Sequence, residues 1–326
     1  MHLLTVENLC VDFPLRKGTI HAVDHVNLNI AQGKLTAIVG ESGSGKTTLA
    51  STFLQYVSAP GVITQGHIWF DGADLLACPA HKLHKYRWKE ISLVFQASQS
   101  ALNPVMTIQQ HFWETFEQHM PGKKQADALP LFRQLLADVR LDPERVLGAY
   151  PHELSGGMKQ RVMIAFAMLL SPRLIILDEP TTALDVITQA YIFDILAGLH
   201  EKSETTMVLL THDIAVVARV ADYIGVMYAG SLVEFGEIHQ VFAHPAHPYT
   251  AHLIHAAPSL LDDFSEKESA FGAAPDLFHL PKGCPYAERC PRKTARCLSS
   301  RPGMRPIADD HRVACRLYDE EGPADA

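Results

Sequence analysis

The residues Gly40 to Thr47 constrain the fold of this chain more than any other stretch. They read GESGSGKT and fit the phosphate-binding loop pattern G-x-x-x-x-G-K-[ST]. The preceding run, Leu35 to Val39, is apolar and rich in β-branched residues, which predicts a buried strand. The following run, Thr47 to Val57, has apolar residues at helical spacing. A strand, a glycine-rich loop and a helix in this order predict an α/β fold that binds phosphate on loop amides.

Each residue type in the loop has a physical role. Gly40, Gly43 and Gly45 lack a Cβ, so the loop can wrap tightly and point its amides inward. Lys46 is expected to reach the β- and γ-phosphates, and the Thr47 hydroxyl is expected to bind Mg²⁺.

Composition excludes several classes of protein. The chain has 326 residues, which leaves room for about two domains. A formal charge of −8 argues against a nucleic-acid binder with a basic face. The sequence has no apolar run long enough to span a bilayer, and its N-terminus reads as a strand instead of a signal peptide. We therefore expect a cytosolic protein whose six cysteines form no disulfide framework.

Three buried strands are expected to end in polar residues. These are Ile91 to Gln96, Leu174 to Asp178 followed by Glu179, and Val208 to Leu210 followed by Thr211 and His212. Ligands bind at the carboxyl ends of parallel strands in open α/β sheets. Asp178 can hold Mg²⁺ there, and Glu179 can orient or deprotonate water. Gln96 and His212 have alternative interpretations, as a surface glutamine and a structural histidine.

Antiparallel strands are predicted elsewhere in the chain. Apolar residues alternate in Leu3 to Phe13 and Ile20 to Ile30, and His67 to Phe70 ends in an Asp-Gly turn. The runs Ile224 to Tyr228 and Ser231 to Phe235 flank Ala229-Gly230 and predict a hairpin.

The aromatic residue Phe13 has two interpretations of equal weight. We expect it in a loop-like region upstream of the phosphate loop, where its ring would stack on an adenine. A core aromatic at the end of a strand has the same spacing.

A helical insertion is expected between Gln96 and Tyr150, with helices over Thr107 to His119 and Gln125 to Val139. After it, Ser155 is a good N-cap for a helix over Met158 to Leu170. With Gly156 and Gly157 behind it, this helix start predicts a second anion site.

We place a domain boundary near residue 245. The two His-Pro pairs in His244 to Thr250 disfavour regular structure, and the chain from about Pro258 onward is irregular and rich in proline, so this tail lacks a substantial core of its own. The expected division is a nucleotide-binding domain over 1–245, with a helical subdomain over about 97–170, and a C-terminal extension over 246–326.

These motifs together resemble the ATP-binding subunit of an ABC transporter. In the family's order they are Walker A at Gly40–Thr47, the Q-loop Gln96, the signature LSGGM at Leu154–Met158, Walker B LIILDE at Leu174–Glu179, the D-loop Ala183-Leu184-Asp185 and the switch His212. The runs PHELSGGM, TTALDV, MYAG and HPYT are similar to the oligopeptide/dipeptide importer branch. Gln96 is followed by Ala97 and Ser98, where that branch usually has Asp-Pro, and this weakens inference about the permease.

The resemblance implies a P-loop ATPase core with an antiparallel β subdomain and a helical subdomain, followed by a small irregular extension that contains cysteines. It also implies that two such domains enclose two ATP molecules, each between the Walker A of one chain and the LSGGM of the other. The residues implied to contact ATP are Phe13, Gly40, Ser42, Gly43, Gly45, Lys46, Thr47, Thr48, Ser155, Gly156, Gly157 and Asp185. Thr47, Gln96 and Asp178 are implied to bind Mg²⁺, while Glu179, His212 and Gln96 serve hydrolysis.

The implied function is ATP hydrolysis that drives an importer for di- or oligopeptides at the cytoplasmic face of the inner membrane. The implied partners are a second ATPase subunit, identical or homologous, two integral membrane permease subunits and, indirectly, an extracytoplasmic solute-binding protein, with no nucleic acid. Related cassettes serve nickel, glycosides and other solutes. A soluble ABC ATPase without a transporter and a non-hydrolysing subunit are the rival interpretations. The single cassette argues against the first rival, and Glu179, Ser155 and His212 argue against the second.

Four cysteines of the extension have the spacing C-x5-C-x6-C-x17-C, at Cys284, Cys290, Cys297 and Cys315. Four thiolates can hold zinc or an iron–sulfur cluster, and the C-x2-C pairs typical of zinc sites are absent from the sequence. The importer branch carries a [4Fe–4S] cluster in this extension, so the resemblance favours the cluster, with Zn²⁺ or no metal as alternatives. Cys10 and Cys78 are expected to be ordinary thiols.

Overall fold

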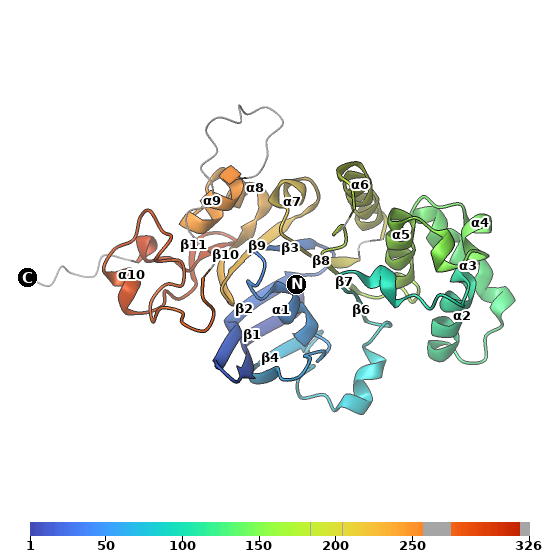
Figure 1. Ribbon diagram of the computed structural model, residues 1–326, viewed down its shortest axis with the longest axis horizontal. Coiled ribbons are helices and arrows are strands. Elements are labelled where there is room, and N and C mark those ends of the chain that lie inside the picture. The colour runs from blue at the N-terminus through green and yellow to red at the C-terminus, as the bar shows by residue number, and fades with distance from the viewer. Residues whose placement is uncertain (183, 204, 257–274, 320–326) are drawn as a thin grey trace, which may run out of the picture. The chain divides into compact units, whose positions relative to one another are not determined.

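The computed structural model describes residues 1–182, 184–203, 205–256 and 275–319 (Figure 1). The chain divides into two compact units. The first comprises Met1, Ile30–Leu35 and Ala77–Leu210, and the second comprises His2–Asn29, Thr36–Leu76 and Thr211–Ala326. Within the described ranges, no helix is both long and apolar enough to cross a membrane.

The first unit contains three parallel strands. They are β6 (Ile91–Val94), β7 (Leu174–Asp178) and β8 (Thr206–Thr211), and β7 is the middle strand. Leu177 pairs with Val94 on one side and with Leu209 on the other. Every residue of β7 is buried, as expected for the centre of a parallel sheet. Asp178 and Glu179 therefore lie at the end of the sheet where its parallel strands terminate.

The helices of the first unit include the expected helical insertion. They are η1 (Ala80–Lys85), η2 (Ser98–Ala101), α2 (Ile108–His119), α3 (Gln125–Asp138), α4 (Pro143–Leu147), η3 (Pro151–Glu153), α5 (Gly156–Ala167) and α6 (Val186–Ser203). Phe112 of α2 packs against Phe132 of α3 and Phe166 of α5, with ring centroids 5.4 and 5.3 Å apart. This aromatic core fixes α5, the helix that carries the LSGGM motif at its start.

The second unit contains an antiparallel sheet in the order β2-β1-β4-β5. Its strands are β1 (His2–Leu15), β2 (Gly18–Ala31), β4 (Val62–Phe70) and β5 (Ala73–Asp74). The expected loop position of Phe13 is wrong, because β1 continues through it to Leu15. The half-buried ring of Phe13 lies close to Gly61.

This unit also contains five strands that are paired in the order β11-β12-β10-β9-β3. They are β3 (Leu35–Val39), β9 (Tyr223–Tyr228), β10 (Ser231–Glu237), β11 (Arg305–Ala308) and β12 (His311–Val313). Strands β3 and β9 pair in parallel, with Thr36 opposite Tyr223, and the other pairs are antiparallel. Two strands of the C-terminal extension thus continue a sheet that begins at the strand before the phosphate loop.

The helices of the second unit are α1 (Lys46–Thr52), α7 (Ile214–Val220), α8 (Ile238–Ala243), α9 (Pro248–Ala256), α10 (Arg296–Ser299) and η5 (Arg316–Tyr318). The expectation that the His-Pro pairs prevent regular structure is wrong for the second pair. Pro248 opens α9, where a proline is tolerated because the first helical amides have no partner within the helix.

The C-terminal extension shares a core with the strands around the phosphate loop. Cys284, Tyr286 and Cys297 pack in one cluster with Tyr228 of β9 and Tyr249 of α9. The described part of the extension, residues 275–319, therefore packs into a core that it shares with the rest of this unit. Residues 257–274, which include Pro258, lie outside the described residues.

Candidate functional site: nucleotide loop, carboxylate edge and signature helix

The phosphate loop between β3 and α1 requires glycine at two positions. Gly40 has φ 155° and Gly45 has φ 100°. A Cβ on Gly40 would collide with the carbonyl oxygen of Met227, and one on Gly45 would collide with that of Ala22. The loop is therefore pressed against the neighbouring backbone at both ends, and any side chain there would force it open.

Lys46 is buried at the mouth of this loop. Its Nζ donates to the carbonyl oxygens of Gly40 at 2.7 Å and Glu41 at 3.1 Å, and to the hydroxyl of Ser44 at 3.4 Å. Among the described residues, no side chain caps the start of α1. A cation and a helix N-terminus together create positive potential in the loop, which suits a polyphosphate. Thr47 and Ser42 are exposed on the loop, and Thr48 is half-buried.

Gln96 and Glu179 lie close together at the carboxyl ends of β6 and β7 in the first unit. Glu179 Oε2 accepts from Gln96 Nε2 at 2.9 Å and from the Thr182 hydroxyl at 2.9 Å. Glu179 has φ 45°, an unusual value for a residue with a side chain, and its N–H donates to Leu210 O at 2.9 Å. Strain of this kind persists where the surrounding structure imposes it, often at active sites. The buried Asp178 precedes it as the last residue of β7.

The left-handed conformation also occurs beside the Q-loop residue. Ala97, with φ 55°, follows Gln96 at the point where the importer branch usually has Asp. Aspartate tolerates this conformation better than alanine does. Alanine therefore adopts this turn less readily than aspartate would.

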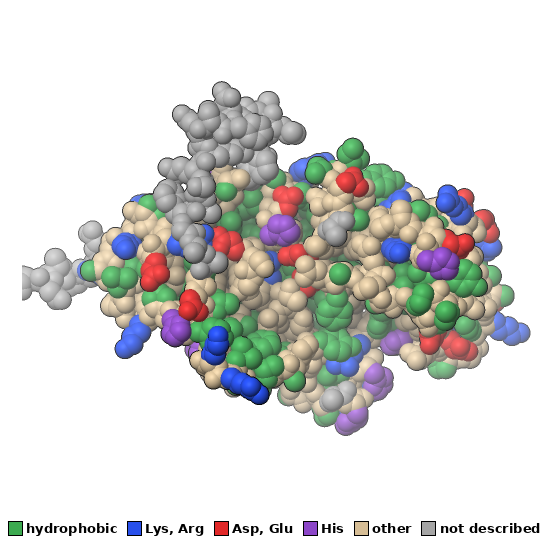
Figure 2. Space-filling view, in the orientation of Figure 1, with side chains coloured by type: hydrophobic (Ala, Val, Ile, Leu, Met, Phe, Trp, Pro, Cys, Tyr) green, Lys and Arg blue, Asp and Glu red, His purple; other side chains and the backbone are tan. Residues whose placement is uncertain are grey.

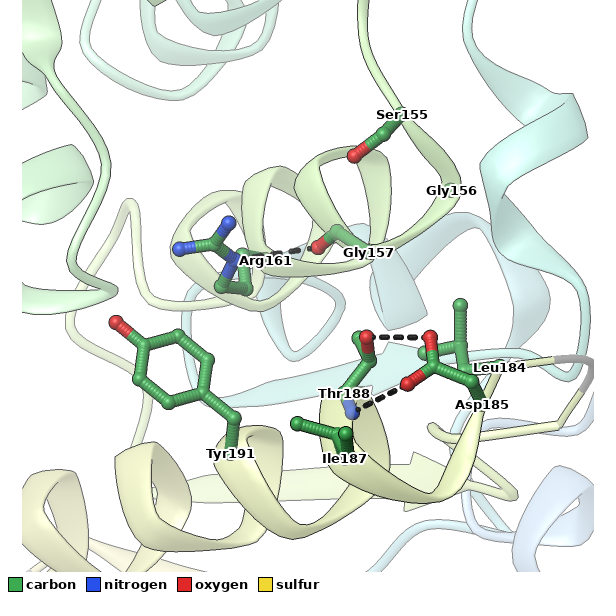
Figure 3. A pocket seen from close by; sticks show the side chains of 9 residues that line it. All are labelled: Ser155, Gly156, Gly157, Arg161, Leu184, Asp185, Ile187, Thr188 and Tyr191. Atoms are coloured by element: carbon green, nitrogen blue, oxygen red, sulfur yellow. Dashed lines mark hydrogen bonds between the residues drawn. The ribbon is translucent and has the colours of Figure 1, made fainter.

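The sequence predicts a second anion site at the start of α5. Ser155 is the N-cap, and its hydroxyl accepts from the N–H of Met158 at 3.3 Å. Ser155 and Gly156 are exposed, and they line a cavity of about 470 Å³ with Asp185 and Tyr191 (Figure 3). A Cβ on Gly157 would press on the side chain of Thr188, so α5 and α6 approach closely here.

Residues of α6 and of the segment just before it line the other side of this cavity. Asp185 accepts from the Thr188 N–H at 3.0 Å and from the Thr188 hydroxyl at 2.6 Å, and these bonds lower the pKa of Asp185 (Figure 3). The Arg161 guanidinium lies over the Tyr191 ring, 5.3 Å from its centroid. Of the predicted D-loop, Leu184 also lines the cavity, and Ala183 lies outside the described residues.

The predicted switch residue His212 is exposed in the bend between β8 and α7. The next residue, Asp213, caps α7 by accepting from the N–H groups of Ala215 and Val216. The imidazole thus lies directly after a parallel strand, which is where the sequence places it.

The four cysteines of the extension lie close enough to influence one another. Cys284, Cys297 and Cys315 are buried, and Cys290 is half-buried. Burial, and then the neighbouring sulfurs, raise the pKa of Cys284 to about 11, and burial also raises the pKa values of Cys290 and Cys315. In the described chain, no three of these sulfurs lie within 4.8 Å of one another.

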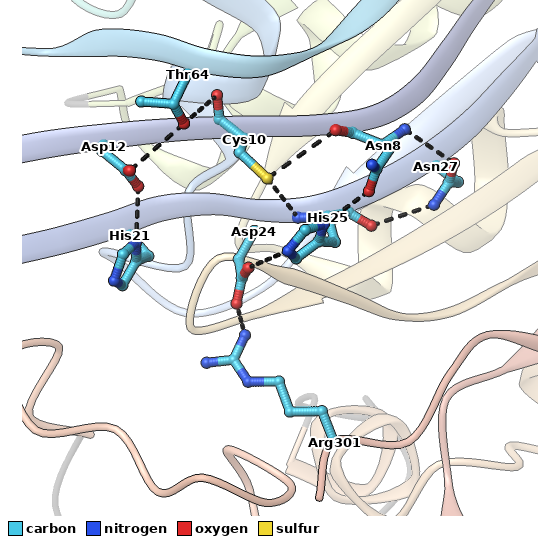
Figure 4. Close-up of polar contacts among 9 residues, drawn as sticks. All are labelled: Asn8, Cys10, Asp12, His21, Asp24, His25, Asn27, Thr64 and Arg301. Carbon is cyan, nitrogen blue, oxygen red and sulfur yellow. Dashed lines mark hydrogen bonds and ion pairs between the residues drawn. The ribbon is translucent and has the colours of Figure 1, made fainter.

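Cys10, expected to be an ordinary thiol, is buried and has polar neighbours. Its sulfur lies within 4.8 Å of a carboxylate oxygen of Asp24 and a ring nitrogen of His25, and it accepts from the His25 N–H at 3.3 Å (Figure 4). Asp24 pairs with Arg301, and His25 Nδ1 bonds to Asn8 Oδ1 at 2.6 Å. These partners already satisfy the carboxylate and one ring nitrogen.

Two residues near the phosphate loop were not predicted from the sequence. Arg289 forms two hydrogen bonds to the carboxylate of Glu41, and the Tyr249 hydroxyl accepts from the Glu41 N–H. No spacing rule connects positions more than 200 residues apart. The sequence signal was limited to an acidic residue inside the loop and an arginine beside a cysteine.

Comparison with known proteins identifies the class to which this fold and site belong. Residues 23–182 match the family model for the ABC transporter, and residues 233–297 match that for the oligopeptide/dipeptide transporter, C-terminal region. The ATP-binding cassette MJ0796, in a post-hydrolysis state with ADP and Pi, matches with a TM-score of 0.63 at 29% identity, covering 72% of this chain and 98% of that one. The predicted fold is therefore confirmed.

Relatives of similar length extend the match to nearly the whole chain. The dipeptide transport ATP-binding protein DppD of Caldanaerobacter subterraneus is 42% identical over 321 residues, which cover 98% of each chain. The oligopeptide transport ATP-binding protein OppD of Haemophilus influenzae is 41% identical over 295 residues, covering 90% of this chain and 91% of that one. This chain belongs to the ATP-binding proteins of the ABC transporter family, in the oligopeptide/dipeptide branch, and it is an ATPase.

Proposed function

We propose that this protein hydrolyses ATP to drive the import of di- or oligopeptides. The observation that carries the cargo assignment is the match of residues 233–297 to the oligopeptide/dipeptide transporter C-terminal region, together with the peptide cargo in the relatives' names. Nickel or glycosides are the alternative cargoes. Uptake of labelled dipeptides by cells that lack this chain tests the assignment, and uptake at the wild-type rate would refute it.

The proposed nucleotide site is built from two copies of the cassette. One chain contributes the loop Gly40–Thr47, with Ser42 and Thr48, and Phe13 against the adenine. The facing chain contributes Ser155, Gly156, Gly157 and Asp185. Ser155 and the exposed Gly156 present helix-start amides to a cavity that is open to an anion, which supports this assignment.

We propose Thr47, Gln96 and Asp178 as the ligands of Mg²⁺. A hydroxyl, an amide oxygen and a carboxylate are the hard oxygen donors that this ion prefers. Mg²⁺ supplies positive charge that offsets the charge of the triphosphate. The amide nitrogen of Gln96 donates to Glu179 at 2.9 Å, so its oxygen is the group left for a cation.

Glu179 is the proposed general base of hydrolysis. Its carboxylate accepts a proton as the water oxygen attacks the γ-phosphorus and the bond to the bridging oxygen breaks. The hydrogen bonds from Gln96 and Thr182 hold the carboxylate in one orientation. Lys46 and His212 are placed to stabilise charge on the γ-phosphate.

The proposed assembly is a peripheral complex on the cytoplasmic face of the inner membrane. The chain would pair with a second ATPase subunit and two permease subunits and serve an extracytoplasmic solute-binding protein. On the face drawn in Figure 2, lysine and arginine side chains lie among acidic ones. Co-purification of permeases from detergent extracts supports this proposal, and purification without membrane proteins would favour a soluble ABC ATPase.

The proposed domain division assigns residues 1–245 to the nucleotide-binding domain and 246–326 to the extension. Residues of about 97–170 form the proposed helical subdomain, which includes α2, α3 and α4. The match of the C-terminal region model begins at residue 233, close to this boundary.

We also propose a [4Fe–4S] cluster on Cys284, Cys290, Cys297 and Cys315. The four cysteines lie close enough to influence one another, and four thiolates can hold such a cluster. The spacing C-x5-C-x6-C-x17-C lacks the C-x2-C pairs typical of zinc sites, which favours the cluster over a single Zn²⁺ ion. When bound, the cluster supplies a cross-link among four points of the extension.

Anaerobic purification followed by iron, sulfide and zinc analysis tests the cluster. About four irons per chain are expected, falling to none in Cys297→Ser, whereas Cys78→Ser keeps the full complement because Cys78 lies elsewhere. Stoichiometric zinc without iron would refute the cluster and leave a zinc site, and no metal would refute both.

A further inference from the structure

A buried ion pair connects the C-terminal extension to the phosphate loop. Arg289 NH1 and NH2 each donate to one carboxylate oxygen of Glu41, and both distances are 2.9 Å. The side chain of Arg289 is 8% exposed and that of Glu41 is 29% exposed. A bidentate pair of this kind fixes the orientation of both groups, and losing one partner leaves a poorly solvated charge.

Aromatic side chains hold Arg289 in place. The Tyr228 hydroxyl lies 3.2 Å from its NH1, and the guanidinium carbon lies 5.6 and 5.7 Å from the ring centroids of Tyr228 and Tyr286. The hydrogen bonds to Glu41 raise the pKa of Arg289. The arginine is therefore a fixed cation within the tyrosine cluster rather than a mobile surface group.

Other contacts tie the same loop to the extension. The Glu41 N–H donates to the Tyr249 hydroxyl at 2.9 Å, while its carbonyl accepts from Lys46. A Cβ on Gly43 would lie 3.9 Å from Leu277, so the extension also reaches the middle of the loop. The side chain, N–H and carbonyl of Glu41 are thus all bonded, two of them to residues beyond 245.

The charge of Glu41 explains why this connection matters for nucleotide binding. The carboxylate belongs to the loop that would receive a triphosphate, and an uncompensated anion there repels the ligand. Arg289 neutralises it, and Tyr249 holds the backbone amide of the same residue. The loop is therefore both shaped and charge-balanced by residues far away in the sequence.

We propose that Arg289 and Tyr249 are positioning residues of the nucleotide site, so that the C-terminal extension is required for tight ATP binding. This inference rests on the proposed role of Gly40–Thr47 in binding the triphosphate. It assigns the extension a role in the ATPase site itself, in addition to any metal that it holds.

The test is the Kd of the full chain for the magnesium complex of a non-hydrolysable ATP analogue, measured by calorimetry. Arg289→Met should raise this Kd about tenfold, because Glu41 is left unpaired. The effect should be smaller for ADP, which carries less charge. Glu41→Gln combined with Arg289→Met should recover most of the lost affinity, because neither charge is then left unpaired. Arg296→Met is the matched control, because Arg296 is exposed in the same extension, and it should bind as the wild type does.

Each outcome decides the proposal. A wild-type Kd for Arg289→Met, or a double variant as weak as Arg289→Met, would overturn it, since a purely structural defect is not rescued by neutralising Glu41. If Arg289→Met does not fold, Arg289→Lys replaces it, which keeps the charge but loses the two-pronged geometry. It should bind about threefold more weakly, and an unchanged Kd would again overturn the proposal. If Lys46→Ala also binds normally, the assignment of the loop itself fails instead.

Discussion

The two glycine-rich helix starts of this chain, at Ser155 and at Gly45, are held in place by different contacts. At Ser155, the cap of α5 is local, because the hydroxyl bonds an amide three residues away. At Gly45, the start of α1 has no side-chain cap among the described residues, and the loop before it is held by Tyr249 and Arg289. The signature helix is thus organised by its own sequence, and the phosphate loop by a distant segment.

Because of this difference, the two sites should respond differently to substitutions. A local cap fails only when its own residue changes. A loop held by tertiary contacts fails when any supporting residue moves, including residues of the extension that never touch nucleotide. Four predictions test this contrast, beginning with the largest expected effect.

The phosphate loop should not tolerate Lys46→Ala. The variant removes the buried cation at the mouth of the loop, and we expect loss of tight ATP binding with at least about a thousandfold lower turnover. Equilibrium binding and phosphate release measure the two effects. Wild-type turnover would contradict the loop assignment, and an unchanged circular dichroism spectrum excludes unfolding.

Glu179→Gln should separate binding from chemistry. The amide keeps the size of the side chain but removes the base, so ATP binds while hydrolysis falls about a hundredfold to a thousandfold. A closed pair of chains should accumulate, with each loop facing a Ser155 helix start. Single-turnover hydrolysis at the wild-type rate would show that another group acts as the base.

The folded state around the phosphate loop should lose stability in mild acid, because His247 is buried in its neutral form. Burial lowers the pKa of His247 to about 4, and its Nδ1 accepts from the Tyr249 N–H at 3.1 Å. The unfolded chain protonates this group below about pH 6.5 while the folded chain does not. Its contribution to stability is therefore complete above pH 6.5 and is lost as the pH falls toward 4.

His247 should lower the free energy of unfolding by about 2 kcal/mol at pH 5 relative to pH 8. Denaturant unfolding at the two pH values measures it. His247→Asn, which keeps an acceptor but does not titrate, should show a smaller loss than the wild type. Equal losses in both proteins would assign the pH dependence to other groups.

Ser155→Ala should have the smallest effect. Loss of the cap costs about 1 kcal/mol, and Ser155→Gly should cost only a few tenths. Turnover by the assembled pair should fall about tenfold, because one hydroxyl donor to phosphate is missing. The Kd of the isolated chain for ATP should stay unchanged, and a raised Kd would show that the two helix starts are not independent.

The same contrast explains how much could be predicted from the sequence. Strand, loop and helix patterns located Lys46, Ser155 and Glu179, because each is set by its immediate neighbours in the chain. The bonds from Gln96 and Thr182 to Glu179 needed the sheet to be assembled. Arg289 could not be predicted at all, since its partner lies 248 residues away and its neighbour Cys290 suggested only a metal site.

Local rules also misplaced some boundaries. Phe13 was expected in a loop, although β1 continues through it to Leu15. The helix after the phosphate loop ends at Thr52 instead of Val57. The Thr52 hydroxyl bonds to the carbonyl of Leu49, a local alternative to the helical hydrogen bond that the apolar spacing does not reveal.

The bonds between Glu41 and the extension have a reciprocal consequence. If docking of Tyr249 and Arg289 tightens ATP binding by some factor, then bound ATP must tighten that docking by the same factor. Each cycle of loading and hydrolysis would then alternately fasten and loosen residues beyond 245. The extension would thus report the nucleotide state of the cassette to any partner that contacts it.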